Sequence, residues 1–276
     1  MNIAICYSGQ LRTGRKCLES QRRFLGEFAS ADTFIHTWTK NTDPRFIGLR
    51  GVTSVPTSEL DAYLEKLNPT KSLIEDPVDA GIFNVTTGHW PSAKSCFYSW
   101  RRSVELALEH ERLRGKKYDV IVKLRPDVIF SEECALSSEL PVEEDVFLIG
   151  KLEHNPGWRT DERVYDELFI STRSTTERAL KFYTSAFETK ECGHVNIAKW
   201  LIDNDILPKM AKSEKLISYR KIASKFDPLT EFEKCAVGLE RLNSANPFFY
   251  RDPAVSLRHN SSYTIIQPGE KADYYS

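Results

Sequence analysis

The sequence lacks the features that mark several common classes of protein. No apolar run approaches the roughly 18 residues of a transmembrane helix. The six cysteines are scattered, with no CxxC pair and no Cys/His spacing suited to zinc, so we expect reduced thiols. The formal net charge of -1 gives no overall field that would attract nucleic acid. We therefore expect neither a membrane span nor a nucleic-acid partner.

Targeting segments and repeats are also missing. Met1 leads directly into a strand-like run without a basic leader, and no repeat or low-complexity segment follows, so we expect a cytoplasmic protein. With 276 residues, of which 41% are hydrophobic and 28% charged, the chain can form one large α/β domain. We place that domain at residues 1–225 and expect residues 226–276 to form a C-terminal helix and tail packed on it.

The stretch that organises the chain is a short apolar run that ends in opposite charges. Residues 120–124 are typical of a strand buried on both faces of a mainly parallel sheet. Pro126 has no N–H for a ladder bond, so we expect pairing to end there, with Arg125 and Asp127 at the carboxyl end. In open α/β sheets that edge binds ligands. These charges suit a diphosphate and a metal ion held by Asp127; a structural ion pair is the alternative.

A polar loop containing glycine connects the first predicted strand, residues 1–7, to a predicted helix at residues 15–28. The backbone N–H groups of such a loop can bind an anion near a helix N-terminus, and an arginine can add a bidentate phosphate contact. The candidate phosphate-binding residues are Ser8, Gly9, Gln10, Arg12 and Thr13. An ordinary βα turn is the alternative interpretation.

This loop is not a complete P-loop. Gly9 and Gly14 have the required spacing, but Arg15 and Lys16 stand where a lysine and a serine or threonine are needed. The lysine for the β- and γ-phosphates and the hydroxyl for magnesium are therefore missing. A phosphotransferase that uses a nucleoside triphosphate is the less favoured enzymatic alternative.

Two further polar residues are expected near the same edge of the sheet. His36 lies near the end of a predicted strand at residues 32–38, and a hydrogen-bonded structural role is the alternative to a ligand contact. Lys94 lies in the first turn of the clearest predicted helix, which ends at Gly115. We interpret most of residues 41–90 as an inserted loop that holds one short helix and one short strand.

Two adjacent carboxylates, Asp166 and Glu167, begin the apolar run that continues to Ile170. Because strand side chains alternate, one of the two faces inward, where it can act as a general base for a hydroxyl within reach. A solvent-facing charge pair is the alternative. A helix with a capping-box pattern is predicted at residues 174–187, and His194 lies near the start of the next helix.

A basic segment lies towards the end of the predicted domain. Residues 209–225 hold six lysines and arginines against one glutamate. Such a segment can contact anionic lipid at a membrane surface or a phosphorylated acceptor, and a solvated face is the alternative. A last helix is predicted after Asp227.

Five short motifs occur in order along roughly the first three quarters of the chain. They are ICYSGQLRT at residues 5–13, DTFIHTW at 32–38, YDVIVKLRPD at 118–127, DELF at 166–169 and GHVN at 193–196. Together they resemble a group of GT-A-type glycosyltransferases that build capsular, lipopolysaccharide or viral surface glycans. The resemblance implies a Rossmann-like α/β fold, with a mainly parallel central sheet flanked by helices, that binds a nucleotide sugar.

The resemblance also implies a metal ion and a base. Enzymes of this group usually hold a divalent cation, Mn2+ or Mg2+, with an Asp-x-Asp motif, but Arg125 stands in place of the first aspartate. Either Asp127 holds the metal alone, or Arg125 neutralises the diphosphate and reduces the need for metal. Asp166 or Glu167 would be the base of an inverting transfer; if neither faces the donor, a retaining mechanism or another base is favoured.

The implied activity is transfer of a sugar from a nucleoside-diphosphate sugar, with a UDP-sugar favoured, to a hydroxyl of a glycan or lipid-linked saccharide. His194 would lie near the diphosphate, a role for which His259 competes. The donor-binding residues would be Ser8, Gly9, Gln10, Arg12, Thr13, His36, Lys94, Arg125, Asp127 and His194. Because the first aspartate is absent, a non-catalytic module that binds glycans or nucleotide sugars is the alternative.

Overall fold

The computed structural model describes residues 1–11, 14–42, 52–82, 92–130, 132, 134–149, 152–154, 162–164, 167–182, 193–211 and 216–218. Residues 1–218 form one unit. The boundary predicted at residue 225 and the helix predicted after Asp227 lie outside the described residues.

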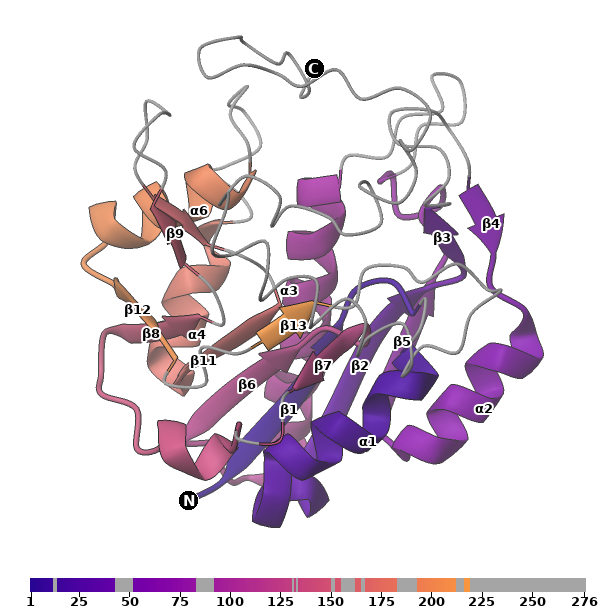
Figure 1. The fold of residues 1–276 in the computed structure, drawn as a ribbon, viewed down its shortest axis with the longest axis horizontal. Helices are drawn as coiled ribbons and strands as arrows, with labels where there is room; N and C mark the ends of the chain where they lie inside the picture. The colour runs from indigo at the N-terminus through magenta and orange to yellow at the C-terminus, as the bar shows by residue number, and fades with distance from the viewer. Residues whose placement is uncertain are drawn as a thin grey trace, which may run out of the picture. The chain divides into compact units, whose positions relative to one another are not determined.

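The strands of the central sheet are β1 (Ile3–Ser8), β2 (Asp32–Trp38), β5 (Lys71–Glu75), β6 (Val120–Leu124), β8 (Val146–Ile149), β11 (Leu168–Thr172) and β12 (Leu207–Met210). Their order in space is β12-β8-β11-β6-β1-β2-β5 (Figure 1). All neighbouring pairs are parallel except those of β11, which runs antiparallel to both β6 and β8. The sheet is therefore mainly parallel.

Helices connect these strands and cover the sheet. They are α1 (Gly14–Leu25), α2 (Thr57–Leu67), α3 (Ser92–Arg114), α4 (Arg173–Leu180) and α6 (Gly193–Asp203), with 3-10 helices η1 (Gly26–Ser30) and η2 (Leu136–Glu139). Three antiparallel pairs lie outside the central sheet. They are β3 (Lys40–Thr42) with β4 (Val52–Ser54), β7 (Val128–Phe130) with β13 (Leu216–Ser218), and β9 (Leu152–His154) with β10 (Glu162–Val164).

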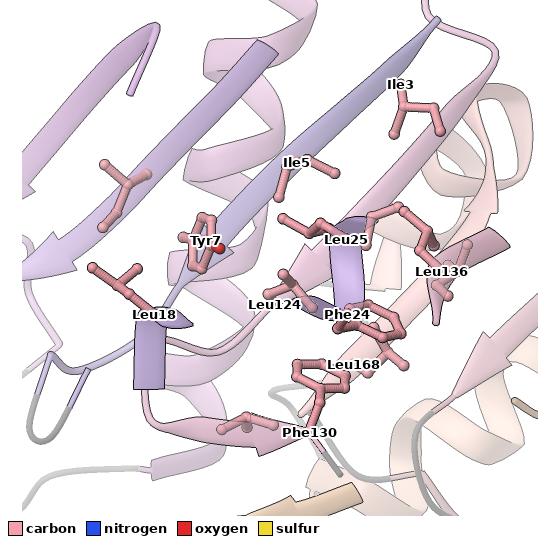
Figure 2. Packing of buried hydrophobic residues seen from close by; sticks show 14 of the residues in the cluster. Ile3, Ile5, Tyr7, Leu18, Phe24, Leu25, Leu124, Phe130, Leu136 and Leu168 are labelled. Carbon is pink, nitrogen blue, oxygen red and sulfur yellow. The ribbon is translucent and has the colours of Figure 1, made fainter. Parts of the chain in front are cut away.

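Side chains along β1 alternate between two apolar clusters, one on each face of the sheet. Ile5 and Tyr7 belong to the cluster that holds Phe24 of α1, which Figure 2 shows from close by. Cys6 belongs to the cluster on the other face, with Trp100 of α3. Because both faces are covered, β1 and β6 are buried along their whole length. This burial explains why the two strands are largely apolar rather than alternating with polar residues.

The strand order reverses beside β1. β2 and β5 follow β1 on one side, whereas β6 pairs with β1 on the other side. The register of β1 and β6 runs from Ile3 with Val120 to Tyr7 with Leu124, so both strands end at the same edge. In open α/β sheets, ligands bind outside the carboxyl ends of the strands at such a switch point. The fold therefore brings together the turns that follow β1 and β6.

The predicted fold class is confirmed: the protein is α/β and Rossmann-like, with a mainly parallel central sheet flanked by helices. The strands predicted at residues 1–7, 32–38 and 120–124 are β1, β2 and β6. The long helix predicted to end at Gly115 is α3, and Gly115 has the positive φ of a helix-terminating glycine.

The short helix and the short strand predicted within residues 41–90 are α2 and β5, but both are part of the domain itself and not of an inserted loop. β5 is the edge strand of the central sheet, and α2 buries Tyr63 in the core. β5 lacks a clear sequence pattern because an edge strand is only partly covered. It carries charges at Lys71 and Glu75, and none of its residues is fully buried.

Two helix boundaries also differ from the prediction. The helix predicted from Ser174 begins at Arg173, and its N-cap is Thr172, whose side chain accepts a hydrogen bond from the Thr175 N–H. The capping-box interpretation, with Ser174 as the cap, is therefore wrong. The α-helix predicted to continue to Phe28 ends at Leu25 and passes into η1.

Truncation of Phe130 tests the core that supports the β1–β6 edge. Its ring stacks on Phe24 with 3.9 Å between the centroids, and both residues are buried. We expect Phe130→Ala to lower the free energy of unfolding by about 3–5 kcal/mol. Leu113→Ala is the control, because Leu113 is 74% exposed, and should change it by less than about 0.5 kcal/mol. Similar losses in urea unfolding of both variants would contradict this assignment of the core.

Candidate functional site

The turns after β1 and β6 lie close together at the switch point. A β-carbon placed on Gly9 would lie 3.9 Å from Cδ of Pro126 and 4.0 Å from Cγ of Arg125. Gly9 has a φ of +120°, a conformation that residues with side chains rarely adopt. The backbone at the end of β1 therefore requires glycine, although there is space for a methyl group.

The Gly9 peptide is held by buried side chains from two other elements. Its N–H donates to Oγ of Ser99 in α3 at 2.7 Å and, less closely, to the carbonyl oxygen of His36 at 3.3 Å. Its carbonyl accepts a hydrogen bond of 2.9 Å from Oγ1 of Thr37. Both polar groups of Gly9 are thus fixed by the protein.

A buried amide from the other face of the sheet holds the turn after β6. Nε2 of Gln21, in α1, donates to the carbonyl oxygens of Arg125, Pro126 and Val128 at 3.1, 3.0 and 2.8 Å. Gln21 is completely buried. Because no ladder bond holds this turn at Pro126, the amide of Gln21 takes over that task.

Arg125 and Asp127 form a bidentate ion pair within this turn. Nε and a terminal nitrogen of Arg125 donate to the two carboxylate oxygens of Asp127 at 2.9 and 2.8 Å. The side chains are only 4% and 1% exposed. Two parallel charge-assisted bonds are the strongest form of this contact, and a buried pair depends on both partners being present.

The described residues do not fit a metal centre. Both carboxylate oxygens of Asp127, the predicted ligand, accept hydrogen bonds from Arg125. In the described part of the chain, no group of three His, Cys, Asp or Glu side chains could hold a metal ion. A divalent cation at Asp127 would have to share these oxygens with Arg125 and take its other ligands from outside the described residues.

Ser8, the last residue of β1, has a polar group suited to a ligand. It is 1% exposed, and its Oγ has no hydrogen-bond partner among the described residues. A buried hydroxyl without a partner costs free energy, and a ligand oxygen at this position would remove that cost. Ser8 lies one residue before Gly9 and shares the edge with Arg125.

His36 is buried at the end of β2 with both ring nitrogens hydrogen-bonded. Nδ1 lies 2.8 Å from Oγ of Ser99, and Nε2 lies 2.8 Å from a carboxylate oxygen of Glu75 in β5. The ring packs edge-on against Trp38, which stacks on Tyr98. His36 therefore lies at the predicted edge, but its contacts are to the protein.

Burial lowers the pKa of His36 to about 4, against the raising effect of Glu75, so the ring is neutral at pH 7. Partial burial raises the pKa of Glu75, but hydrogen bonds and charges from His36 and Arg102 outweigh this and hold it below the usual value. Glu75 is therefore a carboxylate that accepts from Nε2–H of His36. The single ring proton is then on Nε2, which leaves Nδ1 to accept from the hydroxyl of Ser99.

Four further candidate residues lie in the described part of the chain, and the side chain is described for all of them except His194. Glu167 immediately precedes β11, is 7% exposed, and its carbonyl accepts from the Arg125 N–H at 3.1 Å. Gln10 is buried next to Gly9. Lys94 is partly exposed in the first turn of α3. His194 lies in the first turn of α6, where its side chain is not described.

Thus the structure brings Ser8, Gly9, Gln10, His36, Arg125, Asp127 and Glu167 to one edge of the sheet. Arg12, Thr13, Asp166 and His259 lie outside the described residues, so their roles stay predictions.

Sequence reasoning missed the side chains that hold the two turns: Gln21, Thr37, Glu75 and Ser99. A signal for Ser99 was present, because Ser95, Ser99 and Ser103 recur every four residues and share one face of α3. All three serines are buried. A stripe of serines in an otherwise apolar helical face indicates hydrogen-bonding partners on the neighbouring strands.

The basic segment predicted at residues 209–225 is described only in part. Lys209 forms an exposed ion pair with Glu143 at 3.2 Å. Of the helices in the described ranges, none is both long enough and apolar enough to cross a membrane.

Comparisons with known proteins give only distant likenesses. No protein-family model and no curated protein matches this sequence. A nucleoside-diphosphate-sugar pyrophosphorylase from Vibrio cholerae RC9 matches with a TM-score of 0.42 and 14% identity, over 84% of this chain and 99% of that one. A glycosyltransferase involved in glycosylation of the major capsid of PBCV-1 matches with a TM-score of 0.40 and 8% identity, over 86% and 100%. At these TM-scores neither likeness carries an argument about activity.

Protonation of His36 should make the protein sensitive to acid. Its pKa is about 4 in the folded protein and 6.5 ordinarily, so between these values the unfolded chain binds more protons and stability falls as pH falls. The full loss is up to about 3 kcal/mol, and the lowered pKa of Glu75 acts in the same direction. In urea unfolding at pH 7 and pH 4, we expect His36→Gln, which does not titrate, to lose about 2–3 kcal/mol less than wild type. Equal losses would contradict the buried neutral histidine.

Arg125→Gln should destabilise the protein strongly, because it leaves the buried carboxylate of Asp127 without its bidentate partner. We expect a loss of about 3–5 kcal/mol in the free energy of unfolding. The double variant Arg125→Gln with Asp127→Asn removes that charge and should recover part of the loss in the same urea titration. The single variant Asp127→Asn completes the comparison. If the double variant loses as much free energy of unfolding as Arg125→Gln and Asp127→Asn added together, the ion pair does not couple these residues.

Proposed function

We propose that this protein is a glycosyltransferase that moves a sugar from a nucleoside-diphosphate sugar to a hydroxyl of a glycan acceptor. UDP-sugars are the favoured donors and the first to test. The five sequence motifs that resemble GT-A-type enzymes support the class of reaction. The described geometry supports the donor site, because the first three of those motifs meet at the carboxyl edge of the sheet.

The observation that carries the proposal is the juxtaposition at the switch point. The unsatisfied hydroxyl of Ser8 at the end of β1, the Gly9 backbone and the guanidinium of Arg125 are brought close together there. A hydroxyl donor, a close backbone approach and a buried cation suit the oxygens of a diphosphate. Other buried groups among the described residues, such as the Tyr63 hydroxyl, also lack a partner, so the Ser8 hydroxyl supports a donor site through its place at the switch point.

The reaction follows from charges at this edge. A carboxylate takes the proton of the acceptor hydroxyl while the hydroxyl oxygen forms a bond to the anomeric carbon. The bond from that carbon to the diphosphate oxygen breaks, and its electron pair leaves with the nucleoside diphosphate. Attack opposite the leaving group inverts the anomeric carbon. Glu167, next to the turn that carries Arg125, is the described candidate for the base, and Asp166 is its neighbour in the chain.

The departing diphosphate gains negative charge that the site has to stabilise. The Arg125–Asp127 pair is neutral as a whole, so a further positive charge is needed beside it. We assign this role to Arg12, which stands between the end of β1 and the start of α1 in the sequence. On this assignment Mn2+ or Mg2+ is dispensable for donor binding, in agreement with the poor fit of the described residues to a metal centre.

The acceptor is a hydroxyl-bearing glycan or a lipid-linked saccharide. In the second case, residues 209–225 would contact the anionic membrane surface that carries the acceptor.

A thermal-shift panel of UDP, GDP, CMP, ADP and ATP, each with Mn2+ or with a chelator, tests donor binding. A ligand that binds only the folded state raises its melting temperature, by roughly 5–10 °C at a concentration about 100 times its Kd. We expect a nucleoside diphosphate, UDP first, to give this shift with or without Mn2+. UDP release from a panel of UDP-sugars in the presence of glycan acceptors then tests turnover.

Ser8→Ala separates a binding role from a structural one. Removing an unsatisfied buried hydroxyl should leave the stability of the free protein unchanged or slightly raised, while affinity for UDP falls roughly tenfold or more. Ser20→Ala is the control for affinity, because the Ser20 hydroxyl donates to the carbonyl of Cys17 and accepts at 3.4 Å from the N–H of Phe130, so both of its contacts are within the protein. No shift with any nucleotide would overturn the proposal. A larger shift with ATP than with UDP would favour phosphotransfer, and nucleotide binding without turnover would favour a binding module.

A further inference from the structure

A chain of hydrogen bonds crosses four elements and ends on the backbone of the donor loop. It runs from Glu75 in β5 to His36 in β2, then to Ser99 in α3 and to the N–H of Gly9 after β1. The three distances are 2.8, 2.8 and 2.7 Å. These residues are far apart in sequence, so only the fold brings them together.

The protons along this chain are ordered by its charged end. The carboxylate of Glu75 fixes the His36 proton on Nε2, so that Nδ1 accepts from the Ser99 hydroxyl. That hydroxyl, having given its proton to the ring, accepts from the Gly9 N–H. Each bond polarises the next, which strengthens a chain of this kind beyond its separate members.

The surroundings of the chain hold it in one arrangement. Tyr98 donates from its hydroxyl to Glu75 at 3.2 Å, and Arg102 donates to the same carboxylate oxygen at 3.4 Å. Trp38 covers the His36 ring, with 4.7 Å between the ring centroids. Glu75 is therefore fixed by three partners although its side chain is 24% exposed.

Burial decides what these residues can do. The polar side-chain atoms of His36 and Ser99 are buried and already bonded to the protein, so neither residue has a group left to offer a substrate in this arrangement. Their effect on any reaction has to pass through the Gly9 peptide, whose N–H Ser99 holds while Thr37 holds its carbonyl. Fixing both polar groups of Gly9 sets the direction in which the loop leaves β1 after Ser8, and so the place of Gln10.

We propose that Glu75, His36 and Ser99 are positioning residues that set donor affinity by fixing the Gly9 peptide, without contacting the donor. This inference rests on the proposed function, because it takes the loop after β1 as the donor-binding loop. It assigns His36 an indirect role in place of the direct donor contact predicted from the sequence.

Ser99→Ala compared with Ser103→Ala tests this inference. Both serines are fully buried on the same face of α3, but within the described part of the chain the Ser103 hydroxyl donates to the carbonyl of Trp100 in its own helix and not to the Gly9 peptide. We expect Ser99→Ala to raise the KM for the donor about tenfold with kcat within twofold, whereas Ser103→Ala leaves both within twofold. Hydrogen exchange at the Gly9 amide should accelerate in Ser99→Ala alone.

Glu75→Gln provides a second variant, whose folding does not depend on whether the protein tolerates a substitution at a buried position. It keeps the shape of a partly exposed side chain and removes the charge that orders the protons. We expect it to raise the donor KM about threefold and to accelerate exchange at Gly9.

The outcomes separate the two proposals. If wild type binds and turns over the donor, but Ser99→Ala and Glu75→Gln have the same KM as wild type and Ser103→Ala, the positioning role is overturned and the proposed function stands. If wild type neither binds nor turns over any nucleotide sugar, the proposed function fails, and with it the link to donor affinity. Loss of kcat with unchanged KM in Ser99→Ala would also contradict positioning of the donor.

Discussion

The parallel pairing of β1 with β6 is the constraint on which the site depends. In the register of this pairing, both strands end at the same edge of the sheet. Two turns that are distant in sequence, at Gly9 and at Pro126, therefore come close together where the strand order reverses. Neither turn continues a ladder, because Gly9 has a φ of +120° and Pro126 lacks an N–H. Each turn therefore needs side chains from elsewhere to satisfy its backbone, and these side chains give the edge its geometry.

Helices on opposite faces of the sheet provide the side chains that hold these two turns. Gln21 of α1 binds three carbonyls of the turn after β6, and Ser99 of α3 binds the amide of the turn after β1. Both side chains are completely buried, where hydrogen bonds are strong and an unmade one is costly. The two apolar clusters thus do more than cover the sheet, because their helices carry the polar groups that fix the site. On the proposed function, a rigid scaffold of this kind would hold the diphosphate while the reacting sugar and the acceptor lie outside the sheet edge.

The sequence predicted the apolar, β-branched strands and the place where they end, because burial on both faces leaves a clear pattern and proline a clear stop. It also gave the Arg125–Asp127 ion pair as one of two interpretations, and the described side chains form that pair. β5 was predicted as a short strand within an inserted loop and not as part of the central sheet, because an edge strand is half-covered and carries charges. The bonds of His36 to Ser99 and Glu75 join residues 63 and 39 positions apart, and no local pattern pairs residues at such distances. Tertiary packing alone creates the positioning of Gly9.

The most direct measurement is a crystal structure of the protein with UDP at saturating concentration. We predict that the diphosphate lies at the switch point, with an oxygen within hydrogen-bond distance of Oγ of Ser8 and another beside Arg125, while Ser99 still accepts from the Gly9 N–H. A nucleotide bound elsewhere, with the Ser8 hydroxyl buried and without a ligand contact, would contradict the assignment of the donor site.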